Sequence, residues 1–182
     1  MKLTDTARAW LEPSLRLGGH SLDGTAGNGH DTLFLAAHVQ PGYRVLSFDV
    51  QDAAIKQTQS RLITADLSDR VHLIHDSHAH LIQHLPSPKQ LAAAMFNLGY
   101  LPGSDKTITT QASDSVIAIR IALEHLVVGG AITVMAYRGH DGGQTEADAI
   151  AELFESLDST VFGVETKTAP ANGPVLWFAK KA

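Results

Sequence analysis

Short runs of hydrophobic residues alternate along the chain with longer segments in which hydrophobic positions recur at helical spacing. The short apolar runs predict strands at His20–Leu22, Arg44–Phe48, Val71–Ile74, Leu91–Phe96 and Ala131–Met135. Two further β-rich segments, Thr160–Thr166 and Val175–Ala179, have no helix between them. We therefore expect them to form an antiparallel pair joined through Pro170–Pro174.

The longer segments predict helices that alternate with the strands. Their ranges are Asp31–His38, Asp52–Ile63, Thr110–Val127 and Thr145–Leu157, with a short helix closed by Pro86 and Pro88. Gly129-Gly130 is expected to end the longest helix. This order predicts an α/β fold with a Rossmann-like, doubly wound sheet, mostly parallel with an antiparallel C-terminal strand. The length of 182 residues fits one domain, 1–182.

A glycine-rich loop, Asp23-Gly24-Thr25-Ala26-Gly27-Asn28-Gly29-His30-Asp31-Thr32, lies between the first strand and the first long helix. Three glycines at such a turn let a ligand approach the backbone closely. A P-loop would have Lys where His30 stands, and a dinucleotide fingerprint would have a small residue where Thr32 stands. An acidic residue before such a loop is typical of S-adenosylmethionine-dependent methyltransferases; a turn needed only for packing is the alternative. The candidate cofactor-binding residues here are Asp23, Ala26, Gly27, Asn28 and Gly29.

A second acidic residue, Asp49, ends the second predicted strand, 26 positions after Asp23. Nucleoside sites of Rossmann-like folds place a carboxylate here, where it accepts hydrogen bonds from the ribose hydroxyl groups. A helix cap for the following segment is the alternative. Together with the glycine loop, Asp49 predicts a nucleoside cofactor.

The loop Met95-Phe96-Asn97-Leu98-Gly99-Tyr100-Leu101-Pro102-Gly103 follows the fourth predicted strand. Because the carboxyl ends of parallel strands share one edge of the sheet, it faces the same crevice as the glycine loop. Asn97 can accept the N–H groups of an amine, and Tyr100 can stack on a base. These two are the candidate catalytic residues, and Leu98 and Gly99 are candidate substrate-binding residues. A glycine–proline turn capped by Asn97 is the alternative.

Histidines cluster in His75-Asp76-Ser77-His78-Ala79-His80, with His84 four residues further on. This spacing allows a second function, a metal-dependent hydrolase, in which Asp23, Asp31 or Asp76 adds a carboxylate ligand. The stretch follows the third predicted strand, however, where a nucleoside site contacts the adenine. We therefore expect Ser77 and His78 to bind the cofactor and predict no metal.

A further loop, Tyr137-Arg138-Gly139-His140-Asp141-Gly142-Gly143, follows the fifth predicted strand at the same edge. Its tyrosine and histidine could hold a phosphate or a base, so Tyr137 and His140 are candidate substrate-binding residues. A mobile loop whose glycines only relieve strain is the alternative. Asn172-Gly173-Pro174 either closes over the substrate or is a plain turn.

Composition narrows these possibilities. The chain has no cysteine, which excludes disulfides, thiolate metal sites, iron–sulfur clusters and a cysteine nucleophile. The net charge of −5 leaves few basic residues, such as Lys106, Arg138 and Lys180, for phosphate contacts. Recognition of a nucleic acid would therefore depend on a flipped base in a pocket. The charged first ten residues and the absence of a run of about 20 apolar residues predict a cytoplasmic protein without a membrane span.

With these motifs in view, the chain resembles the YtqB-like "putative rRNA methylase" family, whose characterised members methylate a tRNA wobble uridine. The match runs from about Leu22 to Lys181. Its most specific parts are Gly27-Asn28-Gly29-His30-Asp31-Thr32-Leu33-Phe34-Leu35-Ala36, Phe48-Asp49-Val50-Gln51, Ser77-His78, Phe96–Gly103 with Asp105-Lys106 and Thr109-Thr110, and Tyr137 with Gly139-His140. The chain departs from the family pattern in two places. Ala79, after Ser77-His78, stands where the family usually has an acidic residue, and the residues after Asn172 are Gly173-Pro174-Val175, where the family tends to have an acidic residue and two prolines.

The resemblance implies a class I methyltransferase that uses S-adenosylmethionine. Its implied reaction converts the aminomethyl group of 5-aminomethyl-2-thiouridine at the tRNA wobble position (position 34) to methylaminomethyl. It also implies cofactor contacts from Asn28, Asp49, Gln51, Ser77 and His78. The expected partner is the anticodon region of tRNA, and a homodimer would widen the docking surface. Three alternative functions remain: the metal-dependent hydrolase, a non-catalytic nucleotide-binding module, and a methyltransferase that acts on rRNA or on a small amine.

Overall fold

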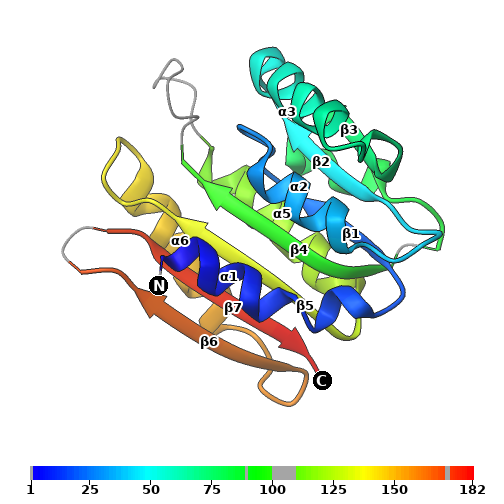
Figure 1. The fold of residues 1–182 in the computed structure, drawn as a ribbon. Coiled ribbons are helices and arrows are strands. Elements are labelled where there is room, and N and C mark those ends of the chain that lie inside the picture. Colours follow the sequence, from blue (N-terminus) through cyan, green and yellow to red (C-terminus); the bar gives the residue numbers. More distant parts are fainter. Residues whose placement is uncertain (1, 89, 100–109, 171–172) are drawn as a thin grey trace.

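The computed structural model describes residues 2–88, 90–99, 110–170 and 173–182, and these form one seven-stranded sheet with helices on both faces (Figure 1). The strands are β1 (His20–Asp23), β2 (Val45–Asp49), β3 (Val71–His75), β4 (Leu91–Leu98), β5 (Leu126–Ala136), β6 (Phe162–Thr168) and β7 (Val175–Lys181). The helices are α1 (Leu3–Leu11), α2 (His30–His38), α3 (Asp52–Thr64), α4 (Leu81–His84), α5 (Ala112–His125) and α6 (Gly143–Glu155). Three short 3₁₀ helices are η1 (Ser14–Arg16), η2 (Ser68–Arg70) and η3 (His78–His80).

The strand order is β3-β2-β1-β4-β5-β7-β6. Strands β1 to β5 pair in parallel, whereas β7 runs antiparallel to both β5 and β6. The prediction of a mostly parallel, doubly wound sheet with an antiparallel C-terminal strand is therefore confirmed. The chain turns back between β1 and β4, and such a switch point opens a crevice at the carboxyl ends of the strands.

Alternating side chains of the strands divide the core into two layers. In β4, Ala93 and Met95 pack with α1, α2 and α3, whereas Ala94, Phe96 and Leu98 pack with α4, α5 and α6. Figure 1 shows α1 in front of β5 and β7, with α5 and α6 behind the sheet. Both faces of β4 are covered, which explains why its sequence is an unbroken hydrophobic run.

Two parts of the fold differ from the sequence predictions. No helix was predicted before the first strand, yet α1 packs on the sheet through Ala7 and Leu11, which are both buried. The helix predicted to reach Val127 ends at His125, and β5 begins at the next residue. The two glycines do not end the helix but lie inside β5, where Gly129 has a φ of +78° and the pairing with β4 shifts register. Glycine adopts this conformation without the steric cost of a Cβ atom.

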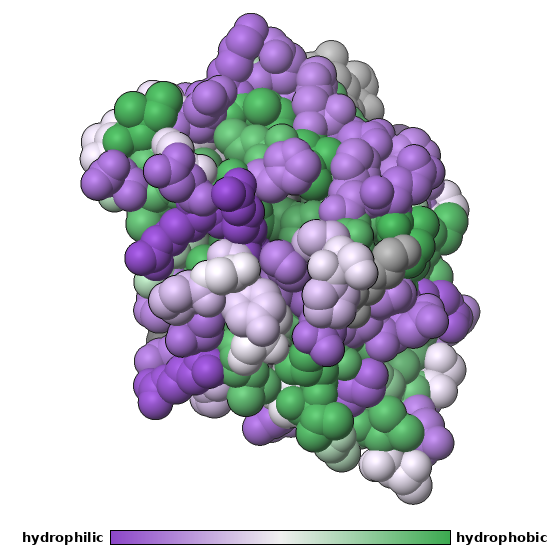
Figure 2. Space-filling model, turned by 90° about the vertical axis from the view of Figure 1, so that its right-hand side faces the viewer, coloured by the Kyte–Doolittle hydropathy of each residue, from purple (hydrophilic) through white to green (hydrophobic). Residues whose placement is uncertain are grey.

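The exposed large hydrophobic residues are distributed over several elements. They include Ile63 on α3, Ile117 on α5 and Val128 on β5. Figure 2 shows the side opposite the carboxyl ends of the parallel strands, where hydrophilic residues predominate and hydrophobic ones appear in several places between them. Isolated apolar residues of this kind are normal on a protein surface. Within the described ranges, none of the helices has the length and apolar character needed to cross a membrane.

Candidate functional site

A pocket of about 350 Å³ opens where the carboxyl ends of the parallel strands meet. Its walls come from the loops after β1, β2, β3, β4 and β5 and from the start of α5. The lining residues are Gly24, Thr25, Ala26, Gly27, Asn28, His30, Asp31, Phe48, Asp49, Val50, Gln51, Asp76, Ser77, His78, Asn97, Leu98, Gly99, Thr110, Gln111, Asp114 and Tyr137. The crevice predicted from the strand order thus brings together most of the candidate residues.

The glycine loop is held against the strand ends by its backbone. The N–H of Gly24 donates to Met95 O at 2.8 Å, and that of Ala26 donates to Phe48 O at 2.7 Å. A Cβ atom on Gly24 would overlap the ring of Phe96. Gly29 has a φ of +80° and precedes α2, and it does not line the pocket. Close packing accounts for these two glycines, and of the two only Gly24 also lines the pocket, together with Thr25–Asn28.

Asp23 does not line the pocket, contrary to its predicted contact with the cofactor. It is 1% exposed, and its oxygens accept hydrogen bonds from Thr32 Oγ1 at 2.6 Å and from Thr25 N at 3.1 Å. Burial, followed by the nearby charge of Asp31, raises the pKa of Asp23 to about 7. The residue supports the glycine loop from within the fold, because its oxygens accept from Thr25 in that loop and from Thr32 on α2.

Asp49 lines the pocket and connects two of its loops. Its Oδ2 accepts from Gly27 N and its Oδ1 from Gln51 N, both at 2.9 Å. Each carboxylate oxygen has a second lone pair available for a ligand hydroxyl group. Asn28 and Gln51, the other predicted cofactor contacts here, line the same wall.

The segment after β3 contributes Ser77 and His78 to the pocket. His78 is 8% exposed, and its Nδ1 lies 2.8 Å from the carbonyl oxygen of Gly24. A carbonyl only accepts, so Nδ1 carries the proton, and Nε2 is left as an acceptor with no partner among the described residues. Burial lowers the pKa of His78, which favours the neutral ring.

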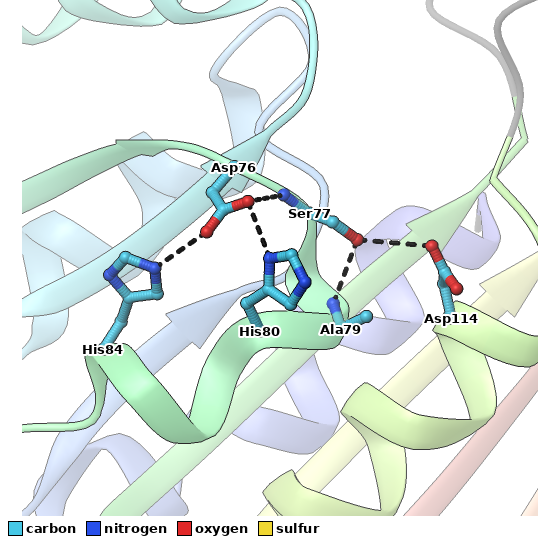
Figure 3. A network of polar contacts seen from close by, with 6 residues as sticks. All are labelled: Asp76, Ser77, Ala79, His80, His84 and Asp114. Atoms are coloured by element: carbon cyan, nitrogen blue, oxygen red, sulfur yellow. Dashed lines mark hydrogen bonds and ion pairs between the residues drawn. The ribbon is translucent and has the colours of Figure 1, made fainter.

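The other histidines of this segment surround a single carboxylate (Figure 3). Asp76 accepts from His80 Nδ1 at 2.8 Å and from His84 Nε2 at 3.0 Å, and these hydrogen bonds, led by that of His84, lower its pKa to about 2. His75 contacts the carbonyl of Val50 instead. Within the part of the chain that the structure describes, no group of three or more His, Asp or Glu residues could hold a metal ion. The arrangement therefore gives the metal-dependent hydrolase no support.

Asn97, Leu98 and Gly99 line the side of the pocket where β4 ends. The N–H of Asn97 donates to Thr25 Oγ1 at 2.8 Å, which joins this loop to the glycine loop. Its Oδ1 is buried and has no hydrogen-bond partner in the described parts of the chain. An orphaned acceptor at a pocket wall is available to a donor group of a ligand. Tyr100, the other candidate catalytic residue, lies outside the described residues.

The loop after β5 contributes Tyr137 but not His140. Tyr137 lines the pocket, and burial, followed by the charge of Asp31, raises its phenol pKa. His140 was predicted to contact the substrate, but it does not line the pocket, and its Nδ1 lies 2.9 Å from the carbonyl oxygen of Asp141. The imidazole packs between the turn into α6 and the end of β4: a Cβ atom on Gly143 would lie 2.9 Å, and one on Gly99 3.6 Å, from its Nε2.

Sequence reasoning missed a contact between α1 and the pocket wall. Asp31, named in the sequence as a possible metal ligand and as part of the glycine-loop motif, lines the pocket and pairs with Arg8 at 2.8 Å. No motif pointed to Arg8, because the two residues are 23 positions apart and belong to different helices. The position of Asp31 directly after the glycine loop was the available signal.

The chemistry of the walls fits S-adenosylmethionine. Four aspartates line the pocket, and the described lining contains neither lysine nor arginine. Such a wall disfavours a nucleoside triphosphate and suits a ligand that carries an ammonium and a sulfonium group. The orphaned acceptor His78 Nε2 suits an N–H or O–H donor of the same ligand. The volume lies within the range of small-molecule sites.

Comparison with known proteins also indicates a methyltransferase. The family model described as "Putative rRNA methylase" matches residues 45–177. A chloroplastic protein of Arabidopsis thaliana named "tRNA (mnm(5)s(2)U34)-methyltransferase" is 32% identical in an alignment of 163 residues that covers 85% of this chain. The chain spans 59% of the length of that relative.

Two solved structures are similar over their whole length. A putative rRNA-methylase from Clostridium thermocellum is 34% identical with a TM-score of 0.93, covering 100% of this chain and 98% of its own. A putative methyltransferase from Streptococcus mutans, solved in complex with SAH, is 30% identical with a TM-score of 0.90, covering 100% and 99%. The predicted class I methyltransferase fold is therefore confirmed.

Proposed function

The chain belongs to the family of putative rRNA methylases, and from this premise we propose that it is an S-adenosylmethionine-dependent methyltransferase that methylates an amino group on tRNA. The family resemblance expected from the sequence motifs is thereby confirmed. When bound, S-adenosylmethionine supplies an electrophilic methyl group. The protein's task is to hold the two reactants in line, because positioning provides much of the acceleration in such a displacement.

The observation that carries the proposal is the acceptor-rich wall beside the end of β4. Asn97 presents a buried oxygen without a partner among the described residues, and the peptide of Leu98 and Gly99 follows it along the pocket. An amine nitrogen supplies the N–H donors that such a wall requires. A hydroxyl group offers only one donor and would satisfy fewer of these acceptors.

A second cavity next to the first supports a large substrate. It has a volume of about 450 Å³ and is lined by the start of α1, the end of β5 and the β6–β7 hairpin. Tyr137 lines both cavities, and Lys2, Thr4 and Thr168 add polar groups to an otherwise apolar wall. A cavity with a tyrosine at one end, hydroxyl groups and one lysine suits a nucleotide that continues from the reacting one.

The specific substrate that we propose is the aminomethyl group of 5-aminomethyl-2-thiouridine at position 34 of tRNA. It is supported by the family resemblance of the motifs and by the name of the Arabidopsis relative. An aliphatic amine is mostly protonated near pH 7. The pocket must therefore bind the neutral amine, or the bound ammonium group must lose a proton before it reacts.

The test is methyl transfer by the purified protein to defined RNA. tRNA from cells that accumulate aminomethyl-thiouridine is incubated with S-adenosylmethionine, and its nucleosides are analysed by mass spectrometry. We expect the aminomethyl nucleoside to be replaced by its methylaminomethyl form. Ribosomal RNA is treated in parallel: methylation of rRNA alone would overturn the tRNA assignment, and methylation of neither RNA would overturn the proposed function.

A further inference from the structure

The four aspartates that line the pocket differ in what their oxygens already bind. Both oxygens of Asp49 accept backbone N–H groups at 2.9 Å, and those of Asp76 accept from two histidine rings. Both oxygens of Asp114 lie 3.4 Å from serine hydroxyl groups. Asp31 is the exception, because only its Oδ1 has a partner and its Oδ2 has none among the described residues.

Arg8 fixes the direction of this free oxygen. Its Nη2 and Nε lie 2.8 Å and 3.1 Å from the same Oδ1 of Asp31. The guanidinium also stacks on Phe34, with 5.6 Å between its carbon and the ring centre. The Asp31 side chain is only 13% exposed. Two hydrogen bonds to one oxygen, combined with this burial, leave the other oxygen as a fixed acceptor in the pocket wall.

The charge of Asp31 acts on the side of the pocket where the substrate is expected. It contributes to the raised pKa of Tyr137, which lines both cavities, after the larger effect of burial. Asn97 Oδ1 is buried without a partner among the described residues, and both hydrogen bonds to the Asp31 carboxylate go to Oδ1, which leaves the negatively charged Oδ2 as a further acceptor.

We propose that Asp31 binds the amino group that is methylated and stabilises the positive charge that its nitrogen acquires. This inference rests on the proposed function and makes Asp31 a catalytic residue. The ammonium form first releases one proton to water. The nitrogen lone pair then forms the bond to the methyl carbon, the electron pair of the broken sulfur–methyl bond stays on sulfur, and the positive charge moves to nitrogen. A fixed carboxylate next to that nitrogen lowers the barrier electrostatically.

The same contact selects the substrate class. A carboxylate in a partly buried wall attracts an ammonium group and leaves a carboxylate or phosphate group uncompensated. We therefore expect aminomethyl-uridine to be accepted and the carboxymethyl analogue to be rejected.

The test variant is Asp31→Asn, which keeps the shape and an oxygen for Arg8 but removes the charge. We expect kcat on aminomethyl-containing tRNA to fall about 10²- to 10³-fold, as is usual when one charge-stabilising group is lost. The affinity for SAH, measured by calorimetry, should stay within about twofold of wild type. Asp69→Asn, at an exposed position on η2, is the matched control and should leave kcat and SAH affinity unchanged.

Three results separate the possibilities. An unchanged kcat in Asp31→Asn overturns the inference. A loss of SAH affinity equal to the loss of kcat also overturns it, because the carboxylate would then hold the amino group of the cofactor. Asp31→Glu keeps the charge and should retain more turnover than Asp31→Asn. An equal loss of turnover in both variants would contradict a role for the charge, even if both variants are less stable than wild type. The wild-type protein is assayed first. If it methylates no RNA amine, the proposed function is overturned, and the Asp31 variants are not needed to show this.

Discussion

Arg8 on α1 and Asp31 on α2 form an ion pair of 2.8 Å that joins the first helix of the chain to the wall of the pocket. The two side chains are 32% and 13% exposed, so the pair is shielded from solvent more than a typical surface salt bridge. Exposed pairs contribute about 0–1 kcal/mol, and hydrogen bonds to charged groups contribute about 1.5–3 kcal/mol when they are buried. The pair thus serves both the packing of α1 and the orientation of Asp31.

The first prediction concerns this pair. Arg8→Gln keeps most of the aliphatic stem and removes the charge. We expect the free energy of unfolding to fall by about 1–2 kcal/mol in urea titrations and kcat to fall while SAH affinity is retained, because Asp31 loses its fixed orientation. Arg16→Gln, which breaks the exposed contact with Glu12 at 3.3 Å, is the control and should change neither quantity measurably. A wild-type kcat in Arg8→Gln would show that Asp31 needs no help from α1.

Asn97→Ala is predicted to separate catalysis from stability. Because Asn97 Oδ1 has no partner within the described ranges, its removal breaks no hydrogen bond between that oxygen and a described residue. We expect the melting temperature to change little, SAH affinity to persist and kcat to fall at least about 10²-fold, since the amine loses an acceptor. Gln83→Ala, at an exposed position on α4, is the control. Normal turnover in Asn97→Ala would remove this residue from the catalytic site.

Asp49→Ala is predicted to weaken cofactor binding. The carboxylate anchors the amides of Gly27 and Gln51 and offers lone pairs to a ribose, so its loss affects both loop order and a direct contact. Charge-assisted hydrogen bonds of about 1.5–3 kcal/mol correspond to a Kd for SAH about 10- to 100-fold higher by calorimetry. Asp52→Ala, at an exposed position paired with Lys56, should bind SAH like wild type. An unchanged Kd in Asp49→Ala would exclude Asp49 from the cofactor site.

Asp23 is predicted to make stability depend on pH. Its pKa is about 7 in the folded protein against 3.8 for a free side chain, so the folded state holds the proton more tightly. This contribution to stability is fully present below about pH 4 and is lost as the pH rises through about 7, at roughly 1.4 kcal/mol per unit of pKa difference.

Asp23→Asn removes this titration. We expect the unfolding free energy of the variant, relative to wild type, to increase between about pH 4 and pH 7 and then to level off, with urea titrations at each pH as the measurement. Groups common to both proteins cancel in the difference. A difference that stays constant over this range would show that Asp23 titrates normally.

Thr168→Glu is predicted to impair RNA binding through the second cavity. Thr168 is exposed at the end of β6 and lines that cavity with Lys2, so a carboxylate there would repel a phosphate group. A repulsion of about 1 kcal/mol raises the KM for tRNA about fivefold while SAH affinity is unchanged. Thr64→Glu, at the end of α3, adds the same charge at a distant exposed position. Equal KM values in the two variants would place the RNA elsewhere.

The fold class and most of the pocket wall can be predicted from the amino-acid sequence alone. The alternation of apolar runs with helical segments required a parallel sheet, and the carboxyl ends of parallel strands meet at one edge. Residues directly after predicted strands, such as Asn28, Asp49, Ser77, His78 and Asn97, therefore had to lie around one crevice, and they do.

What each of these side chains contacts depends on how the helices and strands pack together. Asp23 follows a strand like Asp49, yet it lies beneath the loop because Thr32 and Thr25 satisfy its oxygens there. Of the histidines that suggested a metal site, His80 and His84 share the carboxylate of Asp76 instead. The contact between Arg8 and Asp31 depends on how α1 packs on the sheet. The spacing of hydrophobic residues shows which face of a helix or strand is buried. A contact between residues that are distant in the sequence depends instead on how the elements pack together.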